Sequence, residues 1–281
     1  MADQVMTAGT ELADIVPEVW SAAFYPTLLE ALPFNDSVAR DYEGEINALG
    51  DTVHIPSVPQ FGGAQEIAED EKVDADGVTI STTPLVINKQ VAKDFILTKK
   101  ALRQSIDAQT QLRSLAIFSL MKKMQEVIIA ETVASASAPD HQIPYDSGTT
   151  MALADLLEGK ELLDTANVPD AGQRRAILGS AQWNDLFNIS GFTSRDFIPA
   201  GSPLTSGQIT TPILGFQPRM TTAVGNVAYL FDPIYLQLAV QQLPEVEVFN
   251  LGGEGKRATR VNMDVLFGVK QVSNVRVVEI G

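Results

Sequence analysis

The chain has 281 residues, enough for one large domain or two modest ones, and 45% of them are hydrophobic. Only 20% are charged, so the composition excludes an intrinsically disordered chain. The absence of cysteine excludes disulfide frameworks, thiolate metal sites and cysteine nucleophiles. The two histidines, His54 and His141, are too few for a multi-histidine metal site. No stretch of ~20 apolar residues occurs, so we expect no membrane-spanning helix and no membrane partner.

The net charge of −15 is unevenly distributed. Residues 1–80 hold 16 acidic and two basic residues, whereas residues 89–123 hold eight basic and two acidic ones. Such segments are most often solvated faces of one molecule. They are also typical of surfaces that attract one another between copies of a chain. The overall negative charge argues against nucleic-acid binding by the chain as a whole, although a local basic surface stays compatible with it.

Residues 11–32 are expected to form an interrupted helix, because their apolar side chains recur at every third or fourth position. Trp20 and Phe24 belong to this apolar set, and Pro26 should bend or end the helix. So short a segment has little of its own against which to bury large side chains. We therefore expect it to dock on another element or another subunit.

The pattern of residues 39–83 predicts a long β-hairpin. Strands are predicted at 51–56 and 78–82, and the acidic stretch 66–76 lies between them. An isolated two-stranded hairpin is only marginally stable in water. This hairpin therefore needs a partner surface.

Residues 85–138 contain neither glycine nor proline. A strand is predicted at 85–97 and a long helix at 105–138, with Ser105 as its N-cap. At ~1.5 Å per residue, such a helix would be roughly 50 Å long. Its length suggests an element around which a domain is built.

The second half of the chain mixes helices and strands, and the whole layout is α+β. Residues 233–240 suit either a short helix or a strand. Residues 188–215 are rich in Gly, Pro, Ser and Thr, which predicts a long loop. The other predicted elements are a helix at 152–166, a strand at 175–178, a short helix capped by Ser180, and strands at 216–224, 228–231, 245–249, 257–267 and 269–280.

Motifs for catalysis and cofactor binding are missing. A phosphate-binding loop needs a glycine five positions before its Gly-Lys pair, but Asn250 stands there and Arg257 follows Lys256. No serine lies in a Gly-x-Ser-x-Gly turn. We therefore expect no catalytic, cofactor-binding or metal-binding residues, no cofactor, and no enzymatic activity.

Five segments in chain order resemble a known family, namely Gly50–Pro56, Lys93–Ser105, Pro169–Leu178 with Trp183–Phe187, Ile213–Phe216 with Ala228–Phe231, and Gly268–Val272 continuing to Ile280. Their order is similar to that of the major capsid proteins of tailed bacteriophages with the HK97-type fold. The similarity covers nearly the whole chain as an order of elements. Bacterial encapsulin nanocompartments share this architecture and remain an alternative, and a soluble enzyme with a site at 188–215 is a more distant one.

The resemblance implies an α+β, HK97-like capsid fold and a structural shell protein. Copies would assemble as hexamers and pentamers into an icosahedral phage head around double-stranded DNA, which they would contact non-specifically. A separate scaffolding protein, a portal and a decoration protein would be further partners. The protein would be assembled in the bacterial host cytoplasm and would reside in the virion. The implied parts are an N-terminal arm (1–38), an extended loop (39–83), a peripheral domain with a long spine helix (84–140 and 243–281) and an axial domain (141–242).

Two groups of residues are expected to make the contacts of such a shell. The first would touch neighbouring subunits, and the acidic members would lie near the basic members of a neighbour. The second would face the lumen. The first group is Trp20, Phe24, Glu69, Asp70, Glu71, Lys99, Lys100 and Arg103, and the second is Arg113, Lys122 and Lys123.

Overall fold

A computed structural model describes most of the chain after residue 28. Two units are separated, Met1–Glu30 and Ala31–Gly281, and the elements below belong to the second. The described residues are 29–45, 50–57, 64, 66, 77–99, 108–146, 148, 150–170, 172–189, 209, 212–254 and 257–281.

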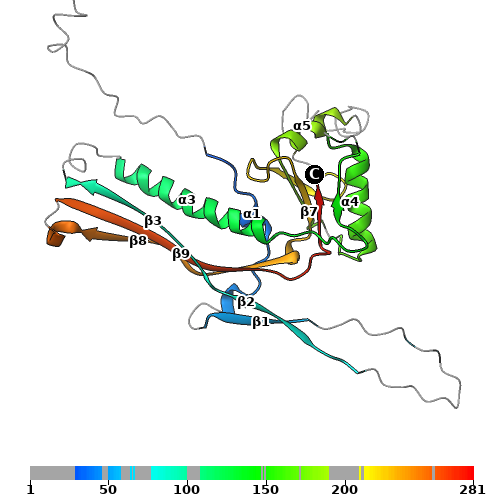
Figure 1. Cartoon of the computed structure of the whole chain (residues 1–281), viewed down its shortest axis with the longest axis horizontal. Helices are drawn as coiled ribbons and strands as arrows, with labels where there is room; N and C mark the ends of the chain where they lie inside the picture. Colours follow the sequence, from blue (N-terminus) through cyan, green and yellow to red (C-terminus); the bar gives the residue numbers. More distant parts are fainter. Residues whose placement is uncertain are drawn as a thin grey trace, which may run out of the picture. The chain divides into compact units, whose positions relative to one another are not determined.

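A three-stranded antiparallel sheet and one long helix pack on each other as two layers (Figure 1). The strands are β3 (Lys89–Thr98), β9 (Ala258–Gln271) and β8 (Leu236–Asn250), with β9 in the centre. Helix α3 (Ala108–Glu131) lies along one face of this sheet. Alternate residues of β9 point toward the helix and are buried there, namely Val261, Met263, Val265 and Phe267.

Helix α3 ends seven residues earlier than predicted. After Glu131 the backbone takes other partners, since the amide of Ser135 donates to the carbonyl of Asn274 and the amide of His141 donates to the carbonyl of Ser135. The predicted N-cap, Ser105, lies outside the described residues. The small alanine and serine side chains that follow the helix add little apolar burial, so these tertiary hydrogen bonds prevail over helix propensity.

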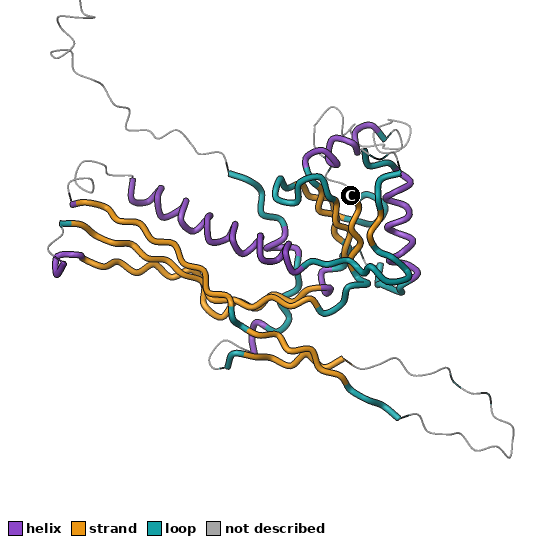
Figure 2. Tube along the Cα trace, viewed as in Figure 1, coloured by secondary structure: helices purple, strands orange, loops and turns teal. Residues whose placement is uncertain are grey.

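A five-stranded sheet forms the second layer (Figure 2). Its order is β4-β10-β7-β5-β6. Helices α4 (Leu153–Thr165) and α5 (Ser180–Asn188) pack on one face, where Leu156, Leu163 and Leu186 join the core of the sheet. The strands are β4 (Gln142–Ile143), β10 (Val277–Ile280), β7 (Ala228–Phe231), β5 (Arg175–Leu178) and β6 (Gln217–Met220).

The predicted hairpin is present, although its second strand covers Ser81–Val86 rather than the predicted 78–82. Strands β1 (Thr52–Ser57) and β2 (Ser81–Val86) pair antiparallel, with Thr52 opposite Val86. The acidic stretch between them lies almost entirely outside the described residues. The remaining short elements are α1 (Phe34–Ser37) and the 3₁₀ turns η1 (Glu43–Glu45), η2 (Pro233–Tyr235) and η3 (Leu251–Glu254).

Several predicted boundaries were wrong. The predicted strand 85–97 is divided between β2 and β3, because the chain turns at Ile87 and Asn88 to change sheets. Residues 236–250 form one bulged strand, whereas separate elements were expected there. The predicted strand 269–280 is broken, since β9 extends to Gln271 and β10 begins at Val277.

Smaller differences occur near the second sheet. Strand β6 covers only Gln217–Met220 of the predicted strand 216–224. Gly179 is the N-cap of α5, so Ser180 is its first helical residue. A Cβ atom on Gly179 would lie 2.0 Å from the carbonyl oxygen of Gly225, and this contact explains why a glycine stands there.

Ion pairs fix the C-terminal end of α4. The ammonium of Lys160 donates to Asp164 over 2.8 Å, and the buried guanidinium of Arg174 pairs with the same carboxylate over 2.7 Å. Arg174 also donates to the carbonyl of Val168 over 2.6 Å. Hydrogen bonds from Lys160 and then from Arg174 hold the pKa of Asp164 below its ordinary value.

Because the pKa of Asp164 is lowered in the folded state, the contribution of this residue to the stability of the fold depends on pH. Ionised Asp164 stabilises the fold above about pH 4, and this contribution is lost as the pH falls through the folded-state pKa. We expect Asp164→Asn to be less stable than wild type at about pH 6, with a smaller difference at about pH 3. Urea unfolding at both pH values tests this, and Glu45→Gln at an exposed site is the control. A difference independent of pH would contradict it.

Candidate subunit-contact surfaces

The base of the β1–β2 hairpin rests on the three-stranded sheet, on the face away from α3. Ile55, Leu85 and Ile87 are buried there against Ala239 of β8. Ala239 stands opposite Gly268 of β9, so two small residues lie side by side beneath the hairpin. The backbone of Val86 and Ile87 comes close to Gly268 at this point, so the base of the hairpin is held to the sheet.

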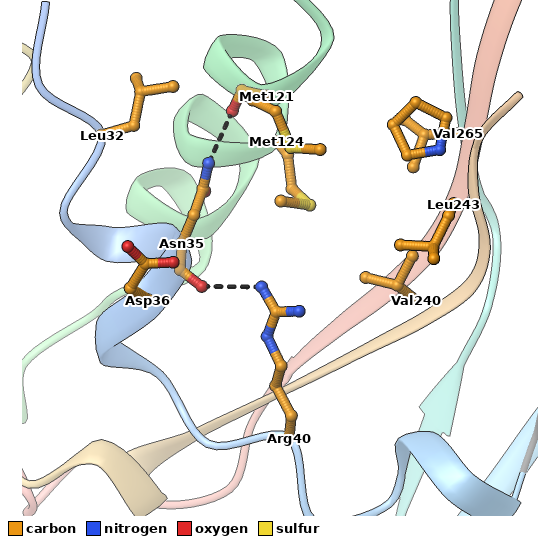
Figure 3. Close-up of a pocket in the computed structure, with 10 residues that line it drawn as sticks. Leu32, Asn35, Asp36, Arg40, Met121, Met124, Val240, Leu243 and Val265 are labelled. Atoms are coloured by element: carbon orange, nitrogen blue, oxygen red, sulfur yellow. Dashed lines mark hydrogen bonds between the residues drawn. The ribbon is translucent and has the colours of Figure 1, made fainter. Parts of the chain in front are cut away.

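A groove of about 310 Å³ lies between α1, α3 and β8 (Figure 3). Asn35 closes one side, where its side-chain amide donates to the carbonyl of Met121 over 3.0 Å. Arg40 stands at the other side and donates to the backbone carbonyl of Asn35 over 2.9 Å. The groove is otherwise mainly apolar, and its remaining lining residues are Leu32, Asp36, Met124, Val240, Leu243, Pro244 and Val265.

A bulge in β8 shapes the rim of this groove. The register with β9 shifts between Val240 and Glu245, which leaves Leu243 and Pro244 without paired partners. The side chain of Leu243 is 71% exposed, the largest exposed fraction among the large apolar side chains described. Proline is tolerated here because β8 is an edge strand.

Four of the basic residues expected at contacts are described by the structure, and they do not all lie on one surface. Lys99 is exposed just after β3, and its amide donates to the carbonyl of Arg257. Arg113 is half-buried on α3, and its Nε is buried without a hydrogen-bond partner. Lys122 and Lys123 are exposed nine and ten residues further on, and Lys123 pairs with Glu126 over 2.7 Å. Nine residues are two and a half turns, so Arg113 and Lys122 lie on opposite sides of the helix.

The other residues expected at subunit contacts cannot be placed. Trp20, Phe24, Glu69, Asp70, Glu71, Lys100 and Arg103 all lie outside the described residues. The expected attraction between the acidic and basic segments of neighbouring copies therefore stays a prediction.

The groove residues were not predicted from the sequence. Asn35 and Arg40 belong to a segment without regular periodicity, and they meet Met121 only in the folded chain. The one sequence signal was Leu243-Pro244, an apolar residue next to a proline between the predicted elements at 233–240 and 245–249. That signal indicates an irregular edge strand, but it does not reveal the groove.

The part of the chain that the structure covers shows neither a metal-binding cluster nor a membrane-spanning helix. No group of three or more His, Asp or Glu side chains there could hold a metal ion. None of the described helices is long and apolar enough to cross a membrane.

Comparison with known proteins identifies the class of protein. The family model described as "Phage capsid protein" matches residues 46–226, more than half of the chain. The chain belongs to this phage capsid protein family. The expected resemblance to tailed-phage major capsid proteins is confirmed, and the family makes the protein a structural component of a phage capsid. No curated protein sequence matches the chain.

Solved structures match this capsid protein over nearly its whole length. A structure from Mycobacterium phage Che8 aligns with 95% of this chain and 97% of the other, at a TM-score of 0.73 and 21% identity. The capsid of cyanophage P-SCSP1u aligns over 99% and 98%, at 0.77 and 12%. The capsid asymmetric unit of cyanophage Pam1 aligns over 100% and 98%, at 0.74 and 17%. These matches confirm the expected α+β, HK97-like fold.

Proposed function

We propose that the protein is the major capsid protein that builds the shell of a tailed-phage head. Copies assemble as hexamers and pentamers into an icosahedral shell around double-stranded DNA. The observation that carries this proposal is the similarity of the whole fold, rather than of one domain, to capsid subunits. A separate scaffolding protein, a portal and a decoration protein are the proposed partners, and the host cytoplasm is the proposed place of assembly.

The two sheets suggest how the subunit is divided. The peripheral domain is built on α3 and the three-stranded sheet, and the axial domain on the five-stranded sheet. Strand pairing differs from the expected ranges at two places. Strand β10 (Val277–Ile280) pairs with β7, so it joins the axial sheet, and β8 enters the peripheral sheet from Leu236.

Electron microscopy of the purified protein tests the proposed function. We expect closed shells, or capsomers, when the chain is expressed with its scaffolding protein. The diameter of the shell distinguishes a phage head from a small encapsulin-type compartment. A monomer or dimer that never assembles with any scaffolding protein would contradict the proposal.

Reversing the charge of Lys99 and Lys100 should impair assembly while leaving the folded subunit stable. The physical reason is the proposed attraction between these lysines and the acidic Glu69, Asp70 and Glu71 of a neighbour. Light scattering during assembly and the thermal midpoint of the subunit are the two measurements. Lys270→Glu, an exposed charge elsewhere on β9, is the control. Wild-type assembly of the double variant would contradict the proposed contact.

A further inference from the structure

The outward surface of α4 combines acidic and apolar side chains. Residues 154, 157, 158, 161 and 165 recur at helical spacing and line one broad, open depression. Leu157 is 47% exposed and is flanked by the exposed Glu158 and Glu161. Neither glutamate has an ion-pair partner among the described residues. This surface would offer a neighbouring subunit one apolar contact flanked by two carboxylates.

The inward surface of α4 is fixed against the sheet. A Cβ atom on Gly159 would lie 2.8 Å from Leu230 of β7 and 3.5 Å from Ile280 and Val278 of β10. The helix therefore sits closely over β10 and β7, and its Glu158–Glu161 side must face away from the sheet. We call this side the acidic face; it consists of Leu157, Glu158 and Glu161.

A basic pair occupies the other end of the same sheet. Strand β6 is an edge strand, and it carries the exposed Arg219 beside the half-buried Arg175 of β5. The Nε of Arg175 is buried without a hydrogen-bond partner, and neither arginine has a carboxylate partner among the described residues. Burial and the neighbouring charge of Arg219 lower the pKa of Arg175. Two unpaired like charges near one another are unfavourable in an isolated subunit. We call Arg175 and Arg219 the basic edge.

The register of the strands places the basic edge on the side of the sheet opposite to α4. Arg219 is level with Ile177 and Tyr229, and those two side chains point into the core shared with α3. The next residues along these strands, including Leu178 and Leu230, point into the core under α4. The sheet order puts the two surfaces near opposite ends as well, since α4 contacts β10 and β4 whereas β6 is the far edge. Figure 1 shows α4 to one side of these strands.

We infer that the acidic face of one copy binds the basic edge of the next copy, head to tail, around the centre of a capsomer. This inference rests on the proposed function and names the contact that would close the ring. Two different patches on opposite sides of one domain form a heterologous contact, which closes into a ring when its rotation fits a whole number of times into one full turn. A self-complementary two-fold contact is disfavoured, because each patch carries charges of a single sign.

The two patches are of similar size and opposite sign. Glu158 and Glu161 are one helical turn apart, so their Cβ atoms are separated by about 5–6 Å. Arg175 and Arg219 are diagonal neighbours on adjacent strands, roughly 7–8 Å apart. A carboxylate from a neighbour would pair with the exposed guanidinium of Arg219. DNA phosphate would offer the basic edge similar chemistry, but it would leave the apolar and acidic surface of α4 uncovered.

A charge exchange tests the contact on the full-length chain. We expect the Glu158→Lys/Glu161→Lys variant to assemble at least roughly tenfold more slowly than wild type, because it places like charges opposite one another. The Arg175→Glu/Arg219→Glu variant should fail to a similar extent. The two variants mixed could alternate around a six-membered ring with opposite charges at every contact, but a five-membered ring would keep one like-charge contact, so the four substitutions are combined in one chain. That chain should assemble again, at a rate near that of wild type.

The readouts are light scattering and electron microscopy at low and high salt, with the thermal midpoint of each subunit as a check on folding. Glu45→Lys, which reverses an exposed charge on η1, is the matched control and should assemble normally. Normal assembly of either charge-reversed variant would overturn the inference. Failure of the combined chain, with its subunit folded, would overturn it too. Arginine variants that assemble normally but retain less DNA would assign the basic edge to DNA instead. If wild type itself never assembles, the proposed function fails rather than this contact.

Discussion

Replacing Phe34 by alanine should lower the free energy of unfolding by about 3–5 kcal/mol. Phe34 is completely buried, although it belongs to a helix of only four residues. Its ring stacks on Phe231 with the centroids 5.9 Å apart, and it meets Tyr229 edge-on at 6.0 Å. Truncation removes these contacts and leaves a cavity that a single-turn helix and strand β7 cannot easily close.

The position of Phe34 makes the expected loss global rather than local. Its cluster contains Phe231 and Tyr229 of the five-stranded sheet, and also Val261 and Phe267 of the three-stranded sheet. One apolar core therefore joins both layers. We expect a single unfolding transition that shifts as a whole to lower denaturant concentration.

Urea unfolding followed by circular dichroism measures this effect. Phe249→Ala is the matched control, because Phe249 is 49% exposed on the edge strand β8. That variant should lose less than about 1 kcal/mol. Equal losses for the two variants would show that the burial of Phe34 does not carry the stability claimed for it.

Local patterns in the sequence predicted much of the fold. The strand at 175–178 and the helix near 152–166 were found because a buried run or a helical period lay between clear turn residues. The hairpin was found because strand patterns at 51–56 and 78–82 enclosed a polar stretch. In each case the information lies within a few residues of the element itself.

Features decided by distant residues could not be predicted in this way. The valine-rich end of the chain looked continuous, yet β10 separates from β9 in order to insert between β4 and β7. The passage of β8 through Pro244 depends on its being an edge strand, which only the sheet order shows. The groove at Asn35 likewise requires α1 to meet α3.

One grouping of site residues could have been refined from spacing alone. Arg113 and Lys122 were expected to share the lumen-facing surface, but nine residues place them on opposite sides of any helix. Arg113 also lies on the helical stripe of the buried Ala116, Leu120 and Met124. The basic edge formed by Arg175 and Arg219 could not be predicted from the sequence. The two positions are 44 residues apart, and only strand pairing brings them together.

Replacing Gly268 by valine should detach the hairpin from the sheet and destabilise the fold by about 3 kcal/mol. A Cβ atom at this position would lie 2.5 Å from the carbonyl oxygen of Val86 and 3.1 Å from the Cα of Ile87. Both contacts are with backbone, so no side-chain rotation relieves them. The chain leaving β2 would have to move, and the burial of Leu85 and Ile55 against Ala239 would be lost with it.

Hydrogen exchange distinguishes this local detachment from general unfolding. Amides of β1 and β2 should lose protection in Gly268→Val, whereas amides of β7, in the five-stranded sheet, should keep most of theirs. Gly44→Ala is the control, because nothing lies within 4 Å of a Cβ atom there. Unchanged protection in β1 and β2 would mean that the hairpin does not depend on close approach to β9. If protection is lost as expected while the subunit stays folded, failure of assembly in the same variant would follow from a misplaced hairpin, since the core that joins the two sheets would still be intact.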